Sequence, residues 1–407
     1  MKFILALIFL TGLLSCQQNQ KPENKLKEDV TYLASDDLQG RETGTKGEAL
    51  AANYIAERFE DLGIAPKGTS NYFQAFNFKP KTDPHAEVEY TVVNEDGSIT
   101  GTNVIGFIDN KAEHTIVIGA HYDHLGYGSE GSLHRGETEI HNGADDNASG
   151  VAVMLNLASK LKGQNTNNNY MFIAFSGEEM GLLGSNYFTK NPTVPQEKIN
   201  YMINMDMVGR LKPDSTLAVY GVGTTPFWKH TLSASNTKFK LVEKESGVGP
   251  SDHTSFYNIE VPVLHFFTGQ HEDYHKPADD FEKLNYQGMA DISDFIFSIV
   301  SELNDNRKLA FRKTKNESED TPRFRVGLGV IPDYLYDGEG MRIDGISEEK
   351  PAQKAGLEKG DIVIQLGDSA VVDMTSYMKA LSVFDKGDST QVTVKRGDKN
   401  VNATIKF

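Results

Sequence analysis

The sequence predicts an α/β fold, with a mostly parallel twisted sheet covered by helices on both faces and a small β-rich domain after it. Three short apolar runs, at 115–118, 170–175 and 201–205, have the length and composition of buried strands. Segments with apolar residues at helical spacing lie at 47–62 and 149–161. Strands that alternate with helices in this way form parallel sheets, and ligands collect beyond the carboxyl ends of the strands.

The amino-terminal segment has the features of a secretory signal peptide. Lys2 precedes an apolar run at 3–14 that is too short to cross a membrane. The run leads into the lipobox LLSC, which ends at Cys16, the only cysteine in the chain. A buried free thiol is the alternative, but this cysteine stands where cleavage would make it the new amino terminus. We therefore expect that residues 1–15 are removed and that Cys16 is lipidated.

A lipid on Cys16 would place the protein in a bacterial cell envelope and bind it to the membrane through this residue. Gln17 is not acidic, which favours the outer membrane or its periplasmic face over retention at the inner membrane. The polar stretch 16–27 is then a tether.

The composition indicates a folded body that does not bind nucleic acid. Hydrophobic residues make up 38% of the 407 residues, and this length suggests two or more domains. The chain has 57 acidic and 41 basic residues and a net charge of -16, which argues against a nucleic-acid partner. Without a second cysteine, the fold must be stabilised without disulfides, mainly by core packing.

The segment before the first of the three apolar runs is expected to form a lid and a sheet edge. Residues 26–77 are predicted to be an N-terminal lid, with the amphipathic helix 47–62 inside it. Residues 88–93 and 103–108 are predicted strands of an edge hairpin or meander, with a turn at 96–97. They lead into the strand at 115–118.

Side chains that can bind a cation follow the predicted strands. The stretch HNGADDNASG, at 141–150, holds two adjacent acids between glycines and small polar residues, and such a pair repels itself unless a metal or proton lies between the carboxylates. Other imidazole and carboxylate groups lie in loops after strands, including a loop that follows a further strand at 263–267. The candidate residues are His121, Asp123, Asp145, Asp146, Glu178, Glu179, Asp206 and His275.

The motifs HxD, GADDNASG, GEE, MDM and YH, in this order, are similar to those of the co-catalytic di-zinc aminopeptidase family, whose relatives include glutamate carboxypeptidases and glutaminyl cyclases. The resemblance spans residues 28–302. It implies that Asp146 bridges two zinc ions, that Asp145 is structural, that Glu178 is the general base, and that the peptide bond between Asp146 and Asn147 is cis. The metal ligands that it implies are His121, Asp146, Glu179, Asp206 and His275.

Charge supports this implied site, because two zinc ions bring four positive charges while the three ligand carboxylates return three. The remaining charge favours deprotonation of a bridging water, whose pKa zinc can bring to about 7. Asp123 is placed to accept a hydrogen bond from the free ring nitrogen of His121. Tyr274 is placed to donate one to a tetrahedral oxyanion. Residues 251–254 resemble a stretch that lines the family's site, and the remaining histidines nearby are expected to be bystanders: His124, His134, His141 and His271.

The C-terminal part of the chain changes character. A final long helix at 289–303 is followed by a charged stretch, 305–320, that we predict to be a linker. Residues 321–407 resemble a bacterial PDZ domain, with strands at 325–330 and 360–363 and short helices at 351–357 and 377–381, the last of which would flank the peptide groove. PDZ domains bind peptides by strand addition. The alternative is that the groove is empty and the domain only packs on the main domain.

Together these patterns predict a lipid-anchored, di-zinc aminopeptidase that hydrolyses amino-terminal residues from peptides. Its catalytic domain is 28–304, and a peptide or protein C-terminus is a possible second partner in the PDZ groove. Within the same fold the alternatives are a single-zinc glutaminyl cyclase and a carboxypeptidase. From another class, the alternative is a non-catalytic envelope binding protein. The presence of all five expected metal ligands favours hydrolysis, and the presence of Glu178 argues against the non-catalytic alternative.

Overall fold

The computed structural model describes residues 22–80, 89–91, 97–128, 131–315, 325–336, 338–347 and 349–407. The predicted signal peptide and Cys16 lie outside the described residues. Helix α1 (Pro22–Leu33) begins inside the stretch predicted as a tether, and Leu26 in it is fully buried. Within the described ranges, no helix combines the length and the apolar character that a membrane crossing requires.

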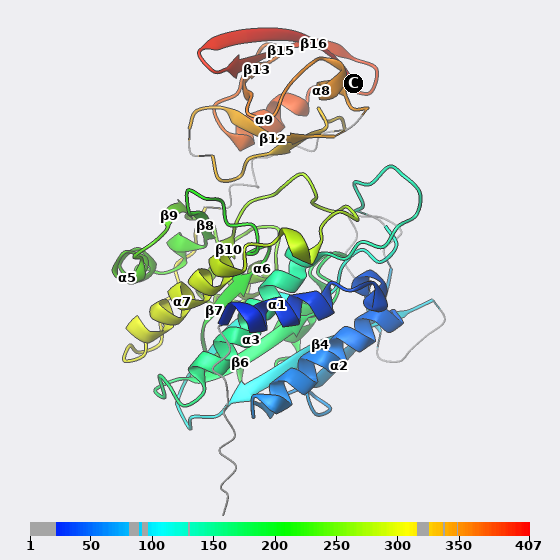
Figure 1. The fold of residues 1–407 in the computed structure, drawn as a ribbon. Coiled ribbons are helices and arrows are strands. Elements are labelled where there is room, and N and C mark those ends of the chain that lie inside the picture. The colour runs from blue at the N-terminus through cyan, green and yellow to red at the C-terminus, as the bar shows by residue number, and fades with distance from the viewer. Residues whose placement is uncertain are drawn as a thin grey trace, which may run out of the picture.

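A ten-stranded sheet lies at the centre of the N-terminal domain, as far as the structure describes it (Figure 1). Its strands are β1 (Ala65–Pro66), β2 (Phe73–Lys79), β3 (Glu89–Thr91), β4 (Ile99–Ile108), β5 (Thr115–His121), β6 (Asn169–Phe175), β7 (Ile199–Met205), β8 (Thr216–Tyr220), β9 (Lys240–Lys244) and β10 (Val263–Phe267). The order is β3-β2-β4-β6-β5-β7-β10-β8-β9, with β1 paired to β4.

The predicted α/β fold class is confirmed, but the parallel part of the sheet is smaller than expected. The central strands β6, β5, β7 and β10 are parallel, as are β8 and β9. The other pairs are antiparallel: β1 with β4, β2 with β3, β2 with β4, β4 with β6 and β10 with β8. Parallel neighbours need a crossover connection, and helices connect β5 to β6 and β6 to β7. The result is a mixed sheet with a parallel centre.

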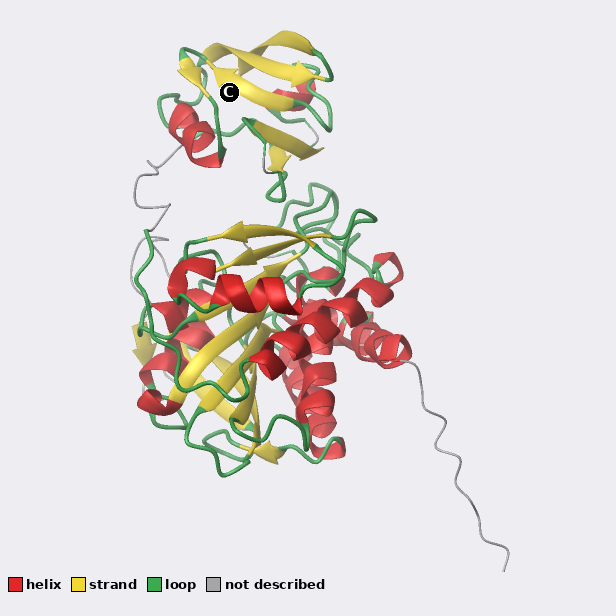
Figure 2. Cartoon of the chain, turned by 90° about the vertical axis from the view of Figure 1, so that its left-hand side faces the viewer, coloured by secondary structure: helices red, strands yellow, loops and turns green. Residues whose placement is uncertain are grey.

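Helices cover both faces of this sheet (Figures 1 and 2). One face carries α1, α2 (Lys46–Asp61), α3 (Gly150–Leu161), α5 (Trp228–Ser235) and α7 (Tyr286–Glu302), which share one hydrophobic cluster. The other face carries α4 (Leu183–Lys190) and α6 (His253–Tyr257). Side chains of β5 alternate between the two clusters, with Ile116 and Ile118 in the first and Val117 in the second. Both faces are therefore buried, as the continuous apolar runs indicated.

Residues 26–77 are not a lid, and this prediction was wrong. Helices α1 and α2 pack into the main core, where Val30 and Phe59 are fully buried. Strand β2 lies between β3 and β4, so these two strands do not form the predicted hairpin. The alternating Phe76 and Phe78 are buried on one face of β2. This period-two pattern was the sequence signal for the missed strand.

The C-terminal domain is built on a six-stranded sheet in the described part of the chain. The order is β11-β12-β13-β15-β16, with β14 paired to β13, and the predicted strand at 325–330 begins only at its last residue. The core contains Leu328, Ile343, Val363 and Leu381. The elements are β11 (Val330–Pro332), β12 (Met341–Ile346), α8 (Pro351–Lys354), β13 (Ile362–Leu366), β14 (Ser369–Ala370), α9 (Met374–Leu381), β15 (Ser389–Arg396) and β16 (Lys399–Lys406).

The first part of the predicted linker packs on the N-terminal domain. Leu309 belongs to the main hydrophobic core, and its amide donates to Asn200 Oδ1 at 2.8 Å. The Thr314 amide donates to the hydroxyl of Tyr257 at 2.9 Å. The linker therefore does not include residues 305–314. Residues 316–324 lie outside the described ranges.

The C-terminal domain lies over the loops of the N-terminal domain (Figure 1). Lys212 Nζ is 3.0 Å from Asp344 Oδ2 and 3.9 Å from Asp333 Oδ1, so one ammonium contacts two acids of the other domain. Leu335 packs with Ala218 and Val242 in a small apolar cluster. These contacts combine an ion pair with apolar burial between the two domains.

Candidate active site

Four neighbouring parallel strands deliver the predicted ligands to one edge of the sheet. His121 is the last residue of β5, the two glutamates follow β6, and Asp206 follows β7. His275 lies in the loop after β10, and Asp146 precedes α3. Because the carboxyl ends of parallel strands meet at one edge, residues far apart in the sequence converge there.

The five predicted ligands form two groups that share one carboxylate. His121 Nε2 lies 3.3 Å from Asp146 Oδ1 and 3.4 Å from Asp206 Oδ1. His275 Nε2 lies 3.3 Å from Asp146 Oδ2 and 3.3 Å from Glu179 Oε2. Each oxygen of Asp146 thus belongs to a different group.

This arrangement fits the donor chemistry of zinc. Ligand atoms about 2.0 to 2.1 Å from a tetrahedral zinc ion are separated from one another by about 3.3 Å, and zinc prefers imidazole and carboxylate donors of this kind. The observed separations within both groups agree with that spacing. Donor atoms of His121, Glu178 and Asp206 also come within 4.8 Å of one another, as do those of His124, Asp146 and Glu179.

The adjacent glutamates lie in different groups. Glu178 is with His121 and Asp206, whereas Glu179 is with Asp146. Burial and the neighbouring carboxylates raise the pKa of Glu178 well above its usual range, although His121 opposes this shift. Burial would also raise the pKa of Glu179, but its histidine neighbours lower it to about 2. The pKa values of the two adjacent glutamates are therefore shifted in opposite directions.

The acids favour positive charge at both imidazoles. Burial lowers the pKa of His275, but Glu179 and Asp146 outweigh burial and raise it to about 11. Burial acts in the same way on His121, whose pKa Glu178 and Asp206 nevertheless raise well above the usual value. The surroundings of both rings therefore stabilise cations.

Asp123 lies behind the cluster and holds the loop of the two glutamates. Its carboxylate accepts from the amides of Glu178, at 3.1 Å, and Glu179, at 3.4 Å, and from Thr43 Oγ1 at 3.0 Å. Its Oδ1 is 3.6 Å from His121 Nδ1, which also lies 3.3 Å from the carbonyl oxygen of Asp123. The carboxylate is thus closer to the glutamate amides than to the ring that we expected it to orient.

The loop that holds Asp146 is fixed by hydrogen bonds of two other carboxylates. Asp145 Oδ1 accepts from the Gly209 amide at 2.6 Å. Asp279 Oδ2 accepts from the amides of Asp145 and Asp146 at 2.9 and 3.1 Å. The peptide bond between Asp146 and Asn147 is cis, as the resemblance implied.

Three residues that the sequence reasoning set aside or overlooked lie at or beside this site. His124 was expected to be a bystander, but its Nδ1 is 2.7 Å from Glu179 Oε1. His271 was also dismissed, yet its Nε2 is 3.2 Å from Asp145 Oδ2. Asp252, in the stretch 251–254, is fully buried, and burial raises its pKa to about 7. A single histidine or acid in a loop has no periodic signal that would identify it.

Arg41 joins the N-terminal segment to the loops that carry the candidate ligands. It is almost fully buried, at 1% exposure. Its guanidinium donates to the carbonyl oxygens of Tyr122 at 2.8 Å, Asn142 at 2.7 Å and Gly143 at 3.0 Å, and to that of Leu33. Burial lowers its pKa to about 10 despite nearby acids, so it remains a cation at neutral pH. The only sequence signal was its place in the GRETG stretch at 40–44.

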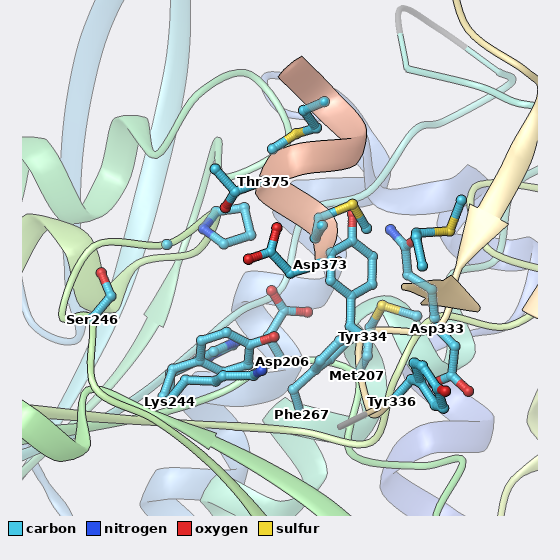
Figure 3. Close-up of a pocket in the computed structure, with 18 of the residues that line it drawn as sticks. Asp206, Met207, Lys244, Ser246, Phe267, Asp333, Tyr334, Tyr336, Asp373 and Thr375 are labelled. Atoms are coloured by element: carbon cyan, nitrogen blue, oxygen red, sulfur yellow. The ribbon is translucent and has the colours of Figure 1, made fainter. Parts of the chain in front are cut away.

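A cavity of about 740 Å³ opens over the cluster and is lined by both domains (Figure 3). Glu178, Asp206 and Tyr274 line it from the N-terminal domain. The Tyr274 ring stacks on His275 with 3.8 Å between ring centroids. Tyr334 and Asp373 line it from the C-terminal domain. A cavity of this size accommodates a small ligand such as a short peptide segment.

Two known families match this chain. The model of peptidase family M28 matches residues 103–300, and that of the PDZ domain matches residues 310–407. The alkaline phosphatase isozyme conversion protein of Escherichia coli is 33% identical over 173 residues, which is 41% of this chain and 46% of that protein. Aminopeptidase YwaD of Bacillus subtilis is 29% identical over 219 residues, 50% of this chain and 45% of that protein. The chain thus spans about half the length of these relatives.

Solved structures share the fold. The aminopeptidase from Aneurinibacillus sp. strain AM-1 superposes with a TM-score of 0.54 at 18% identity, over 72% of this chain and 95% of that one. A zinc aminopeptidase from Bacillus subtilis gives 0.54 at 18% identity, over 72% and 98%. The glutaminyl cyclase of Bacteroides thetaiotaomicron gives 0.53 at 18% identity, over 70% and 98%. At these identities the likeness is one of fold.

Proposed function

Because this chain belongs to peptidase family M28 and carries a C-terminal PDZ domain, we propose that it is a zinc-dependent aminopeptidase that releases amino-terminal residues from peptides. The observation that carries the proposal is the pair of donor groups that share Asp146, with Glu178 beside them. His121, Asp146 and Asp206 would hold one zinc ion, and His275, Asp146 and Glu179 a second. When bound, zinc supplies Lewis-acid polarisation of the scissile carbonyl and lowers the pKa of water to about 7.

The side chains divide the proton transfers between them. Glu178 accepts a proton from the attacking water and passes it to the leaving nitrogen, which departs as an amine. Burial and the neighbouring carboxylates raise its pKa, and a raised pKa helps the carboxyl group to hold the proton between the two transfers. Tyr274, which lines the cavity beside His275, donates a hydrogen bond to the oxyanion. Asp123 keeps the glutamate loop in place.

The decisive experiment combines zinc quantification with a substrate screen on protein that begins at Gln17. Two zinc ions per chain and hydrolysis of aminoacyl reporter amides would support the proposal. Peptides with an acetylated amino terminus should resist, whereas peptides with an amidated carboxyl terminus should still be cleaved. The opposite preference would indicate a carboxypeptidase.

A glutaminyl cyclase is the second candidate, because one of the structural neighbours is such an enzyme. A peptide with amino-terminal glutamine distinguishes the two. Cyclisation releases ammonia and keeps the peptide intact, whereas hydrolysis releases free glutamine. One zinc ion per chain with ammonia release would replace the aminopeptidase proposal.

We also propose that the protein is anchored in the bacterial envelope through lipid on Cys16. Cys16→Ser should release it from membranes into the soluble fraction without changing kcat on a reporter amide, because the predicted anchor precedes the catalytic domain. Fractionation of cells that express either form, followed by assay, measures both effects. Retention of the serine variant on membranes would contradict lipidation.

A further inference from the structure

Two parts of the C-terminal domain that line the cavity lie next to β11 and α9, and the start of β12 lines it as well (Figure 3). One is the segment directly after β11, where Asp333, Tyr334 and Tyr336 line the cavity. The other is the stretch of α9 from Met374 to Met378, where both methionines do so. The beginning of β11 and the last residues of α9 are not in this lining. The cavity therefore meets only one end of the space between these two elements.

The space between β11 and α9 has the features of a peptide groove. β11 is the last strand of its sheet, so among the described strands its outer edge has no neighbour. Val330 on β11 and Met374 and Met378 on α9 are half-buried and pack on the same core cluster. An open strand edge beside apolar side chains is the arrangement to which an extended peptide adds as a further strand.

The end of this groove that lies away from the cavity is suited to a carboxylate. Gly327 and Gly329 directly precede β11, and Gly329 has a left-handed φ of 74°. Within the described part of the chain, neither glycine amide donates to a backbone carbonyl. Backbone amides that lack a carbonyl partner at a glycine-rich turn can bind anions, and such sites capture the C-terminal carboxylate of peptides.

The direction of a bound peptide follows from these positions. A carboxylate held at Gly327 and Gly329 lies at the start of β11, so the rest of the peptide must extend toward the end of that strand, at Pro332. The segment beyond Pro332 and the first turn of α9 both line the metal-site cavity. The amino-terminal part of the peptide is therefore directed toward Glu178 and Asp206, which is the end that an aminopeptidase acts on.

We propose that one peptide occupies both domains at once, with its free carboxylate at the loop of Gly327 and Gly329 and its amino-terminal residue in the metal-site cavity. This inference rests on the proposed aminopeptidase function and adds the substrate class. The preferred substrates are short peptides with a free, apolar C-terminus that are long enough to reach from the loop to the cavity. A shorter peptide loses the carboxylate contact, and a much longer one must form a loop between its two bound ends, at an entropic cost.

The test compares matched peptides on the full-length, zinc-loaded enzyme. Peptides with the same amino-terminal residue and lengths from two to about twelve residues, at about 3.3 Å per extended residue, are prepared as free acids and as amides. Release of the first residue gives kcat/KM for each. For peptides that span both domains, we expect amidation to lower kcat/KM by about tenfold, mostly through KM, because the amide loses the charge of the C-terminal carboxylate. A tenfold change corresponds to about 1.4 kcal/mol. Amidation should not affect dipeptides in this way.

An acid-to-amide ratio that is the same at every length would overturn the proposal while leaving the aminopeptidase function intact. Absence of release from every peptide would instead overturn the proposed function. The two failures are therefore distinguishable.

A variant in the groove supplies a second test. Met378→Glu introduces a charge into the apolar wall of the groove and so disfavours an apolar peptide there. The acid-to-amide ratio for spanning peptides should therefore fall to about one. Val383→Glu is the matched control, because this valine is 67% exposed and does not line the cavity. The control should keep the wild-type ratio. A Met378→Glu protein that melts like the parent and keeps the ratio would contradict the proposal.

Discussion

Glu178→Gln is expected to lower kcat by roughly 100-fold to 10,000-fold, the usual contribution of general acid-base catalysis, while zinc content and melting temperature stay near those of the parent. The amide keeps the shape of the side chain but cannot accept the proton of the attacking water. KM should change little, because the contacts that bind the peptide remain. Metal analysis, thermal melting and initial rates on a reporter amide measure the three quantities.

Glu179→Ala should behave in the opposite way, although it changes the adjacent residue. It removes a donor that lies 3.3 Å from His275 Nε2 and 2.7 Å from His124 Nδ1. Zinc content and melting temperature should therefore fall together, because bound metal stabilises the native state. The donor atoms of Glu178 also come within 4.8 Å of those of His121 and Asp206. If Glu178→Gln loses zinc instead, Glu178 is a ligand and the two roles are reversed.

Removal of zinc by a chelator should abolish activity and lower the melting temperature by roughly 10 °C. A metal present at about 1,000 times its Kd stabilises by about 4 kcal/mol, and each kcal/mol shifts the midpoint of a domain of this size by about 2 to 4 °C. The physical cause is that Asp146, Glu179 and Asp206 repel one another when no cation lies between them. Added zinc should restore both properties.

Asp146→Ala is the control for the chelation experiment. It removes a donor from both groups at once, since His121 and His275 each lie 3.3 Å from one of its oxygens. Its melting temperature should therefore be the same with and without chelator. A parent protein whose melting did not respond to chelation would show that metal does not stabilise the fold.

The parallel centre of the sheet and the residues at its edge could be predicted from the sequence, because both depend on local patterns. Apolar runs identified β5, β6, β7 and β10, and the polar residues after them are the ones that the structure brings together. The motifs also implied the cis bond after Asp146, and the structure has it. Whether these residues hold zinc in the expected roles stays a prediction.

The remainder could not be predicted because it depends on contacts between distant segments. Nothing near β2 in the sequence indicates that it pairs with both β3 and β4. Arg41 donates hydrogen bonds to carbonyl groups that lie 81 to 102 positions later in the sequence. The position of the C-terminal domain over the cavity depends on Lys212 and Leu335, two residues that have no motif.

The contact of Lys212 with Asp344 and Asp333 makes the cavity sensitive to ionic strength. The Lys212 side chain is 34% exposed, so dissolved salt can screen its charge. The screening length falls from about 10 Å at 0.1 M salt to about 3 Å at 1 M. Rising salt therefore weakens the attraction between the domains, while the apolar contact of Leu335 is not weakened by screening. The two domains should separate more often in concentrated salt. The fraction of molecules in which both domains line the cavity should therefore fall as the salt concentration rises.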